Sequence, residues 1–143
     1  MSDTTHVLND TISLLKAGED FYRNAAENVD DPSLKNLFSE NAAIRNAAIT
    51  EMSQKVERLD EDPSGASWTE QARQGYANAE SMFNGTDSLV DYLEEHEDRT
   101  LEQIREALKE ADDREAVKIL TRHLLIFQQT HDRMKAVKDT RTS

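Results

Sequence analysis

Four long stretches of the chain carry apolar residues at alternating steps of three and four, and short segments rich in Pro, Gly, Asp and Ser separate them. Such steps place side chains on one face of an α-helix, whereas a half-buried strand would need strict alternation. The separating segments are VDDPSL, DEDPSGAS, NGTDS and EADDRE. The sequence therefore predicts an all-α fold, with helices over about 4–29, 33–60, 87–111 and 113–139 and a shorter one over 68–83.

Composition narrows the class further. The chain has 143 residues, with only four glycines and two prolines, which fits a single helical domain over 1–143. Its net charge of −12 disfavours nucleic acid and anionic lipid as partners. It has no cysteine, no stretch of about 20 apolar residues and no signal-like N-terminus. We therefore expect a cytoplasmic protein that does not bind membranes.

The lengths of the links predict the topology. Short links at about 30–32 and 112 make the first two and the last two long helices antiparallel hairpins. The long link between 60 and 87 lets the second and third long helices run parallel, which is the connectivity of a ferritin-like bundle, with the 68–83 helix carried on the crossover. The large side chains of that helix would cover the bundle or form a dimer surface; they are Trp68, Tyr76, Met82 and Phe83.

Polar residues interrupt each of the four apolar stripes. Glu19 falls in the stripe that runs from Leu8 to Val29, and Arg45 falls in the stripe of the second helix. Their heights along the first hairpin differ by only about 3 Å, so we expect them to pair. The other two stripes carry Glu97, and His131 with Gln128 one turn before it. Because unpaired charges are costly in an apolar seam, the five residues Glu19, Arg45, Glu97, Gln128 and His131 predict a polar core layer.

Three neighbouring residues have two possible roles each. Tyr22 lies one turn from Glu19 and is either an ordinary half-buried tyrosine, which we favour, or a member of the polar layer. His96 is flanked by four acidic residues, so either these raise its pKa or, as we favour, it lies on a solvated face. Gly18 costs roughly 1 kcal/mol within a helix, a cost that either reflects close approach of another helix or the crossover or is simply tolerated.

Four segments give the chain a resemblance to a known group: LKAGEDFYRNAAE, SGASWTEQARQGY, LEEHEDRTLEQIREAL and QQTHDRMKAVKD. The chain resembles an uncharacterised bacterial family of ferritin-like four-helix bundles, a domain of unknown function. Ferritin-like dinuclear centres use single glutamates from two helices and Glu-x-x-His from the other two. The resemblance implies that Glu19 and Glu97 match the single glutamates, and that Gln128-x-x-His131 resembles one of the motifs with an amide in place of the carboxylate. The second helix instead offers Ala42-x-x-Arg45.

These observations leave two main hypotheses. The first is a non-enzymatic interaction or stress-related protein with a degenerate polar layer and no cofactor, which binds a second copy of itself or another protein. The second is an iron- or manganese-binding protein with a reduced site made of Glu19, Glu97 and His131. Arg45 favours the first, because a fixed positive charge in the layer repels a metal cation. A phosphotransfer module with His123 is a third possibility, although small residues beside that histidine are missing.

Overall fold

The computed structural model describes residues 3–59 and 86–142, which form four α-helices and, within those ranges, no strand. They are α1 (Asp3–Asn28), α2 (Pro32–Arg58), α4 (Thr86–Glu110) and α5 (Arg114–Thr142). Each bound lies within three residues of the range predicted from the sequence. The predicted 68–83 helix and the crossover that carries it lie outside the described residues. None of the described helices has the length and apolarity needed to cross a membrane.

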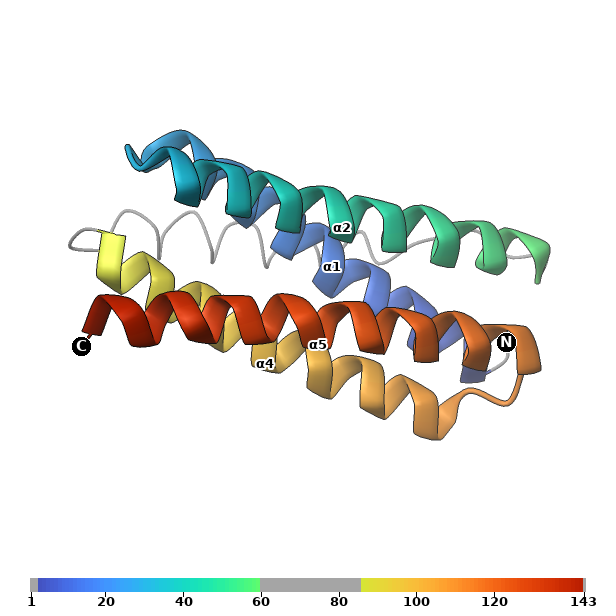
Figure 1. The fold of residues 1–143 in the computed structure, drawn as a ribbon. Helices are drawn as coiled ribbons and strands as arrows, with labels where there is room; N and C mark the ends of the chain where they lie inside the picture. The colour runs from blue at the N-terminus through green and yellow to red at the C-terminus, as the bar shows by residue number, and fades with distance from the viewer. Residues whose placement is uncertain (1–2, 60–85, 143) are drawn as a thin grey trace.

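The four helices pack side by side as two hairpins, α1 with α2 and α4 with α5 (Figure 1). Contacts between the hairpins fix the relative directions. Along α1 and α4, Thr4 bonds Asp112 and Tyr22 bonds Glu97, so these helices are antiparallel. Ion pairs from Glu40 to Arg133 and from Arg58 to Glu115 likewise make α2 and α5 antiparallel. It follows that α2 and α4 run in the same direction.

The turns between paired helices are closed by acidic caps. Asp31 caps α2 by accepting a hydrogen bond from the Ser33 amide (2.8 Å), and Pro32 follows at the first helical position, where no amide donor is needed. Asp113 caps α5 by accepting from the Ala116 amide (2.9 Å) and also pairs with Lys55 of α2. A short turn with an acidic cap thus joins the two helices of each hairpin.

The apolar core consists of two separate clusters rather than one. Leu15, Met52 and Ile104 belong to the cluster near the start of α1 and the end of α2. Phe21 and Phe38 belong to the other, near the α1–α2 turn. Fully or almost fully buried polar residues lie between the clusters along the chain; they are Arg45, His96, Glu97, Thr100 and Thr130. A polar layer therefore divides the interior of the bundle.

Gly18 makes room for this layer on α1. A methyl group added to Gly18 would clash with Nε2 of His96 and would lie 2.8 Å from Nε of Arg45. These two side chains reach Gly18 from α4 and α2 respectively. The absence of a side chain at this position therefore allows two large polar residues to enter the core.

Substitution of Gly18 tests this packing. Replacing an ordinary mid-helix glycine with alanine stabilises a protein by roughly 0.5–1 kcal/mol. Because the space here is filled, we expect Gly18→Ala to lower the free energy of unfolding by about 1–3 kcal/mol in urea denaturation. The penalty should shrink when Gly18→Ala is made in a His96→Ala background, which removes the clashing ring. A stabilising effect of Gly18→Ala in the wild-type background would contradict this packing.

Candidate functional site

The Glu97 carboxylate is the centre of the buried layer. Its Oε1 accepts a hydrogen bond from the Tyr22 hydroxyl (2.6 Å) and lies 3.1 Å from Nη2 of Arg45. Its Oε2 accepts a hydrogen bond from the Thr130 hydroxyl (2.8 Å). The side chains of Arg45 and Glu97 are both completely buried. Residues from all four helices thus converge on one carboxylate.

Arg45 supplies the compensating positive charge. It lies one turn after Asn41 on α2, and its Nη1 donates to the Asn41 carbonyl (3.3 Å). Its guanidinium also lies against two aromatic rings, 4.7 Å from the centre of Tyr22 and 5.1 Å from that of Phe127. Contacts of a guanidinium with aromatic faces are attractive and gain strength when they are shielded from water. The arginine is therefore held by one carboxylate, one carbonyl and two rings.

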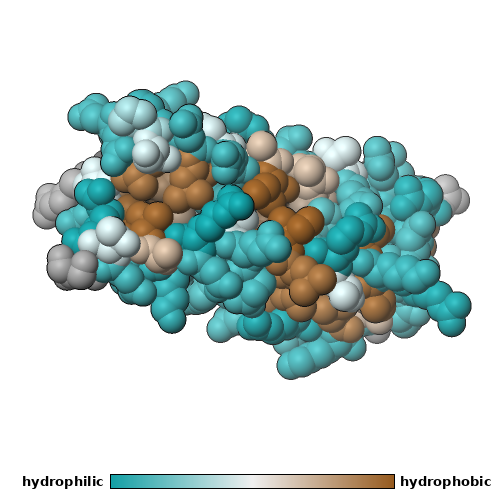
Figure 2. Space-filling view, in the orientation of Figure 1, coloured by the Kyte–Doolittle hydropathy of each residue, from teal (hydrophilic) through white to brown (hydrophobic). Residues whose placement is uncertain are grey.

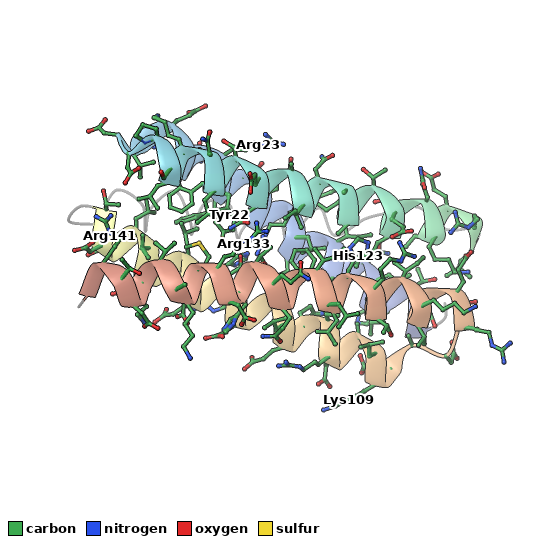
Figure 3. All side chains as sticks on the ribbon, in the orientation of Figure 1. Tyr22, Arg23, Lys109, His123, Arg133 and Arg141 are labelled. Carbon is green, nitrogen blue, oxygen red and sulfur yellow. The ribbon has the colours of Figure 1, made fainter. Side chains whose placement is uncertain are left out.

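Tyr22 acts as a hydrogen-bond donor in this layer. Burial, followed by the negative charge of Glu97, raises the pKa of the Tyr22 hydroxyl well above its ordinary value, although the Arg45 charge opposes the shift. The hydroxyl therefore stays protonated at neutral pH and donates to Oε1. Its aromatic ring lies inside the bundle, as Figure 3 shows. The favoured expectation of a half-buried tyrosine was wrong, and the alternative, a member of the polar layer, is what the structure contains.

His96 adds an imidazole to the layer. It is 1% exposed, so the expectation that it lies on a solvated face was wrong. Burial is the main cause that lowers the pKa of His96 well below its ordinary value, and the charges of Arg45 and Arg99 add to the shift. The ring is therefore neutral at pH 7. It occupies the space that Gly18 leaves open on α1.

Glu19 lies outside the layer. Its carboxylate accepts hydrogen bonds from Arg23 (2.7 and 3.0 Å) on the same helix, and Nδ2 of Asn46 lies 3.4 Å from Oε2. The structure therefore corrects the predicted pair of Glu19 with Arg45, since Arg45 pairs with Glu97 instead. The reason is a shift of one position: Gly18, not Glu19, faces the interior at this level of α1.

His131 and Gln128 also lie away from the Glu97 carboxylate. Nε2 of His131 lies 2.6 Å from Oδ1 of Asp98, and Nδ1 lies 3.3 Å from Oδ1 of Asp132. Gln128 donates to the same Asp132 oxygen (3.2 Å). Partial burial lowers the pKa of His131, but the hydrogen bonds that its ring donates to Asp132 and Asp98, together with the negative charges of Asp98 and Glu94, outweigh burial, so the pKa is raised.

The predicted metal residues Glu19, Glu97 and His131 therefore have separate partners. The structure instead brings His131 together with Glu94 and Asp98, and ligand atoms of these three residues lie within 4.8 Å of one another. Among the residues that the structure describes, these three are the acidic and histidine side chains that lie close enough together to share one metal ion. Whether the protein binds iron or manganese stays a prediction.

Comparison with protein families identifies the chain. The family described as "Domain of unknown function (DUF2383)" matches residues 3–110, about three quarters of the sequence. The chain belongs to the DUF2383 family. The match includes α1, α2 and α4, and hence Tyr22, Arg45 and Glu97, whereas Thr130 and His131 lie beyond it. No curated protein matches the chain.

The prediction for this DUF2383 chain leaves Thr130 out of the polar layer and places His96 on the surface. Thr130 was overlooked because threonine is not a typical core residue, yet it lies three residues after Phe127 and four before Met134, which are both buried. His96 was assigned to the surface because of its acidic neighbours. Gly18, one residue before Glu19, was the available signal for His96, because a small residue in a packed stripe marks a place where larger side chains approach.

The pH dependence of stability tests the buried imidazole. Because the folded-state pKa of His96 lies below the unfolded value of about 6.5, only the unfolded chain gains this proton as the pH falls below about 6.5. The free energy of unfolding should therefore decrease toward acid, with a contribution of up to about 1.4 kcal/mol per pH unit. Urea denaturation between pH 7.5 and 5.5 should give a smaller decrease for His96→Gln than for the wild type. His6→Gln, which changes an exposed histidine, is the control; equal slopes in all three proteins would show that His96 is not buried neutral.

Proposed function

We propose that this protein is a ferritin-like four-helix bundle in which a buried ion pair occupies the layer that would otherwise hold a dinuclear metal centre. On this proposal it is a non-enzymatic cytoplasmic protein that binds a second copy of itself or another protein. The Arg45–Glu97 pair is the observation that carries the proposal.

The directions of the helices support the ferritin-like assignment. Because α2 and α4 run in the same direction, the end of α2 at Arg58 and the start of α4 at Thr86 lie at opposite ends of the bundle. Parallel second and third long helices distinguish ferritin-like bundles from simple up-down-up-down bundles. The four-helix class is established by the structure, and the ferritin-like assignment rests on this inference.

The chemistry of the layer disfavours an oxidase. A dinuclear centre needs several carboxylates and neutral imidazoles that are free to bind cations. Here both oxygens of Glu97 already accept hydrogen bonds, and the nearest charged group is the Arg45 guanidinium. A guanidinium remains protonated at any physiological pH and repels a cation at the same position. The layer therefore fits a structural role better than redox catalysis.

The surface supports a role in recognition. The face in Figure 2 is mainly hydrophilic, with hydrophobic side chains gathered in patches along the bundle. Among the large hydrophobic residues of the described ranges, Leu125 of α5 is exposed, with 66% of its surface accessible to solvent. The aromatic residues predicted for a dimer surface, from Trp68 to Phe83, lie outside the described residues. Self-association is therefore proposed and not assigned to a surface.

Iron or manganese binding is the second candidate function. The group of Glu94, Asp98 and His131 favours it, because its side chains are of the types that bind these metals. It would use a site at the α4–α5 surface and not the buried layer.

An iron-oxidation assay tests the leading proposal. The protein should not accelerate the oxidation of Fe²⁺ by oxygen beyond the rate in buffer, and Glu97→Gln should behave in the same way. Acceleration that saturates with iron and disappears in Glu97→Gln, but persists in Glu51→Gln, would overturn the proposal. Acceleration lost only in His131→Gln would assign oxidation to the α4–α5 surface. Sedimentation velocity on the same samples gives the oligomeric state, and a strictly monomeric protein would restrict the proposal to other partners.

A further inference from the structure

Adjacent residues on α4 and α5 make two parallel contacts, one inside the bundle and one at its surface. Glu97 and Thr130 form the inner contact, with 2.8 Å between Oε2 and Oγ1. Asp98 and His131, the next residue on each helix, form the outer contact at 2.6 Å. Glu94 lies one turn before Asp98 and so projects to the same side of α4. Three side chains thus converge where the two helices meet at the surface.

We propose that Glu94, Asp98 and His131 form a binding site for one divalent first-row transition-metal ion. Each residue offers one ligand atom, and these atoms lie within 4.8 Å of one another, so small side-chain movements would bring all three to a single ion. Two carboxylates and one imidazole suit Mn²⁺, Fe²⁺ or Zn²⁺, whereas Mg²⁺ and Ca²⁺ prefer oxygen ligands alone. This site is separate from the buried layer, and the inference deepens the second candidate function without depending on the structural role proposed for the layer.

The imidazole is already oriented for this role. Nδ1 of His131 faces Oδ1 of Asp132 (3.3 Å), and Gln128 donates to the same oxygen (3.2 Å). A carboxylate that accepts from one ring nitrogen of a metal-binding histidine fixes the tautomer and leaves the other nitrogen for the ion. The nitrogen left for the ion is Nε2, and the ion would replace the hydrogen bond that Nε2 makes with Oδ1 of Asp98 (2.6 Å).

The inner side of the site is held by the packing of α4 against α5, and its outer side is open to solvent. The side chains of Glu94 and His131 are 13% and 16% exposed, whereas that of Asp98 is 54% exposed. The inner contact between Glu97 and Thr130 fixes the alignment of α4 and α5 directly beneath it. An ion could therefore enter from the Asp98 side and keep water in its remaining positions.

A lysine competes for one of the carboxylates. Nζ of Lys138 lies 3.7 Å from Oε2 of Glu94 and 3.6 Å from Oδ1 of Asp91. In the absence of metal, Lys138 and His131 would balance the charges of Glu94 and Asp98. A metal ion would compete with this positively charged lysine for Glu94, so removal of its charge should strengthen binding. A cluster that serves only as surface ion pairs would show no such effect.

Titration of Zn²⁺ and Mn²⁺ into the full-length, untagged protein tests the site, by calorimetry for Zn²⁺ and by electron paramagnetic resonance for Mn²⁺. We expect one ion per chain, affinity at least about tenfold lower in His131→Gln and in Asp98→Asn, and higher affinity in Lys138→Ala. Mg²⁺ and Ca²⁺ should bind more weakly than Zn²⁺ by a similar factor.

His123 provides the matched control. It lies on the same helix and its Nε2 lies 2.7 Å from Oε1 of Glu51 on α2, but Arg122 occupies that carboxylate as well. His123→Gln should therefore leave metal affinity unchanged. Absence of one-to-one binding in both the wild type and Lys138→Ala, or binding that survives His131→Gln in a variant with wild-type helicity, would overturn the proposal.

Discussion

The contact between Arg45 and Glu97 is the interaction on which the rest of the interior depends. Both side chains are completely buried, so neither charge is compensated by water. Removing one partner of such a pair typically costs about 3–5 kcal/mol, because it leaves the other charge buried and unpaired. The surrounding structure follows from this requirement: Tyr22 and Thr130 donate to the carboxylate, two aromatic rings cover the guanidinium, and apolar clusters close the layer from both sides.

The sequence predicts the helices well and the polar layer only in part. Arg45 and Glu97 are buried on α2 and α4 as the stripes predict, because each charge is compensated by the other. On α1 and α5 the reading is displaced by one residue, to Glu19 and His131 in place of Gly18 and Thr130. The interior positions there are the small residues Gly18 and Thr130, which an apolar pattern does not mark as core residues. Gly18 must be small because side chains from α2 and α4 occupy the space beside it, and the sequence of α1 alone does not show this.

A step of one residue along α4, from Glu97 to Asp98, separates two kinds of chemistry. Glu97 faces inward, where Arg45 neutralises it and its hydrogen bonds are satisfied. Asp98, one position later and hence about 100° around the helix, faces the surface beside His131. The inner layer is suited to holding four helices in one arrangement. The outer group, with one exposed carboxylate, one mostly buried carboxylate and an oriented imidazole, is where we propose that a metal ion binds without disturbing that arrangement.

A double-mutant cycle between Arg45 and Glu97 tests the central claim most directly. Arg45→Met and Glu97→Gln should each lower the free energy of unfolding by about 3–5 kcal/mol in urea denaturation. The double variant has a neutral layer in which the side-chain amide introduced by Glu97→Gln can still accept from Tyr22, so its loss should be smaller than the sum by at least about 2 kcal/mol. Glu51→Gln, which breaks a partly exposed pair with Arg122, should cost no more than about 1 kcal/mol. Losses for Arg45 and Glu97 that simply add would contradict the claim that this buried pair organises the bundle.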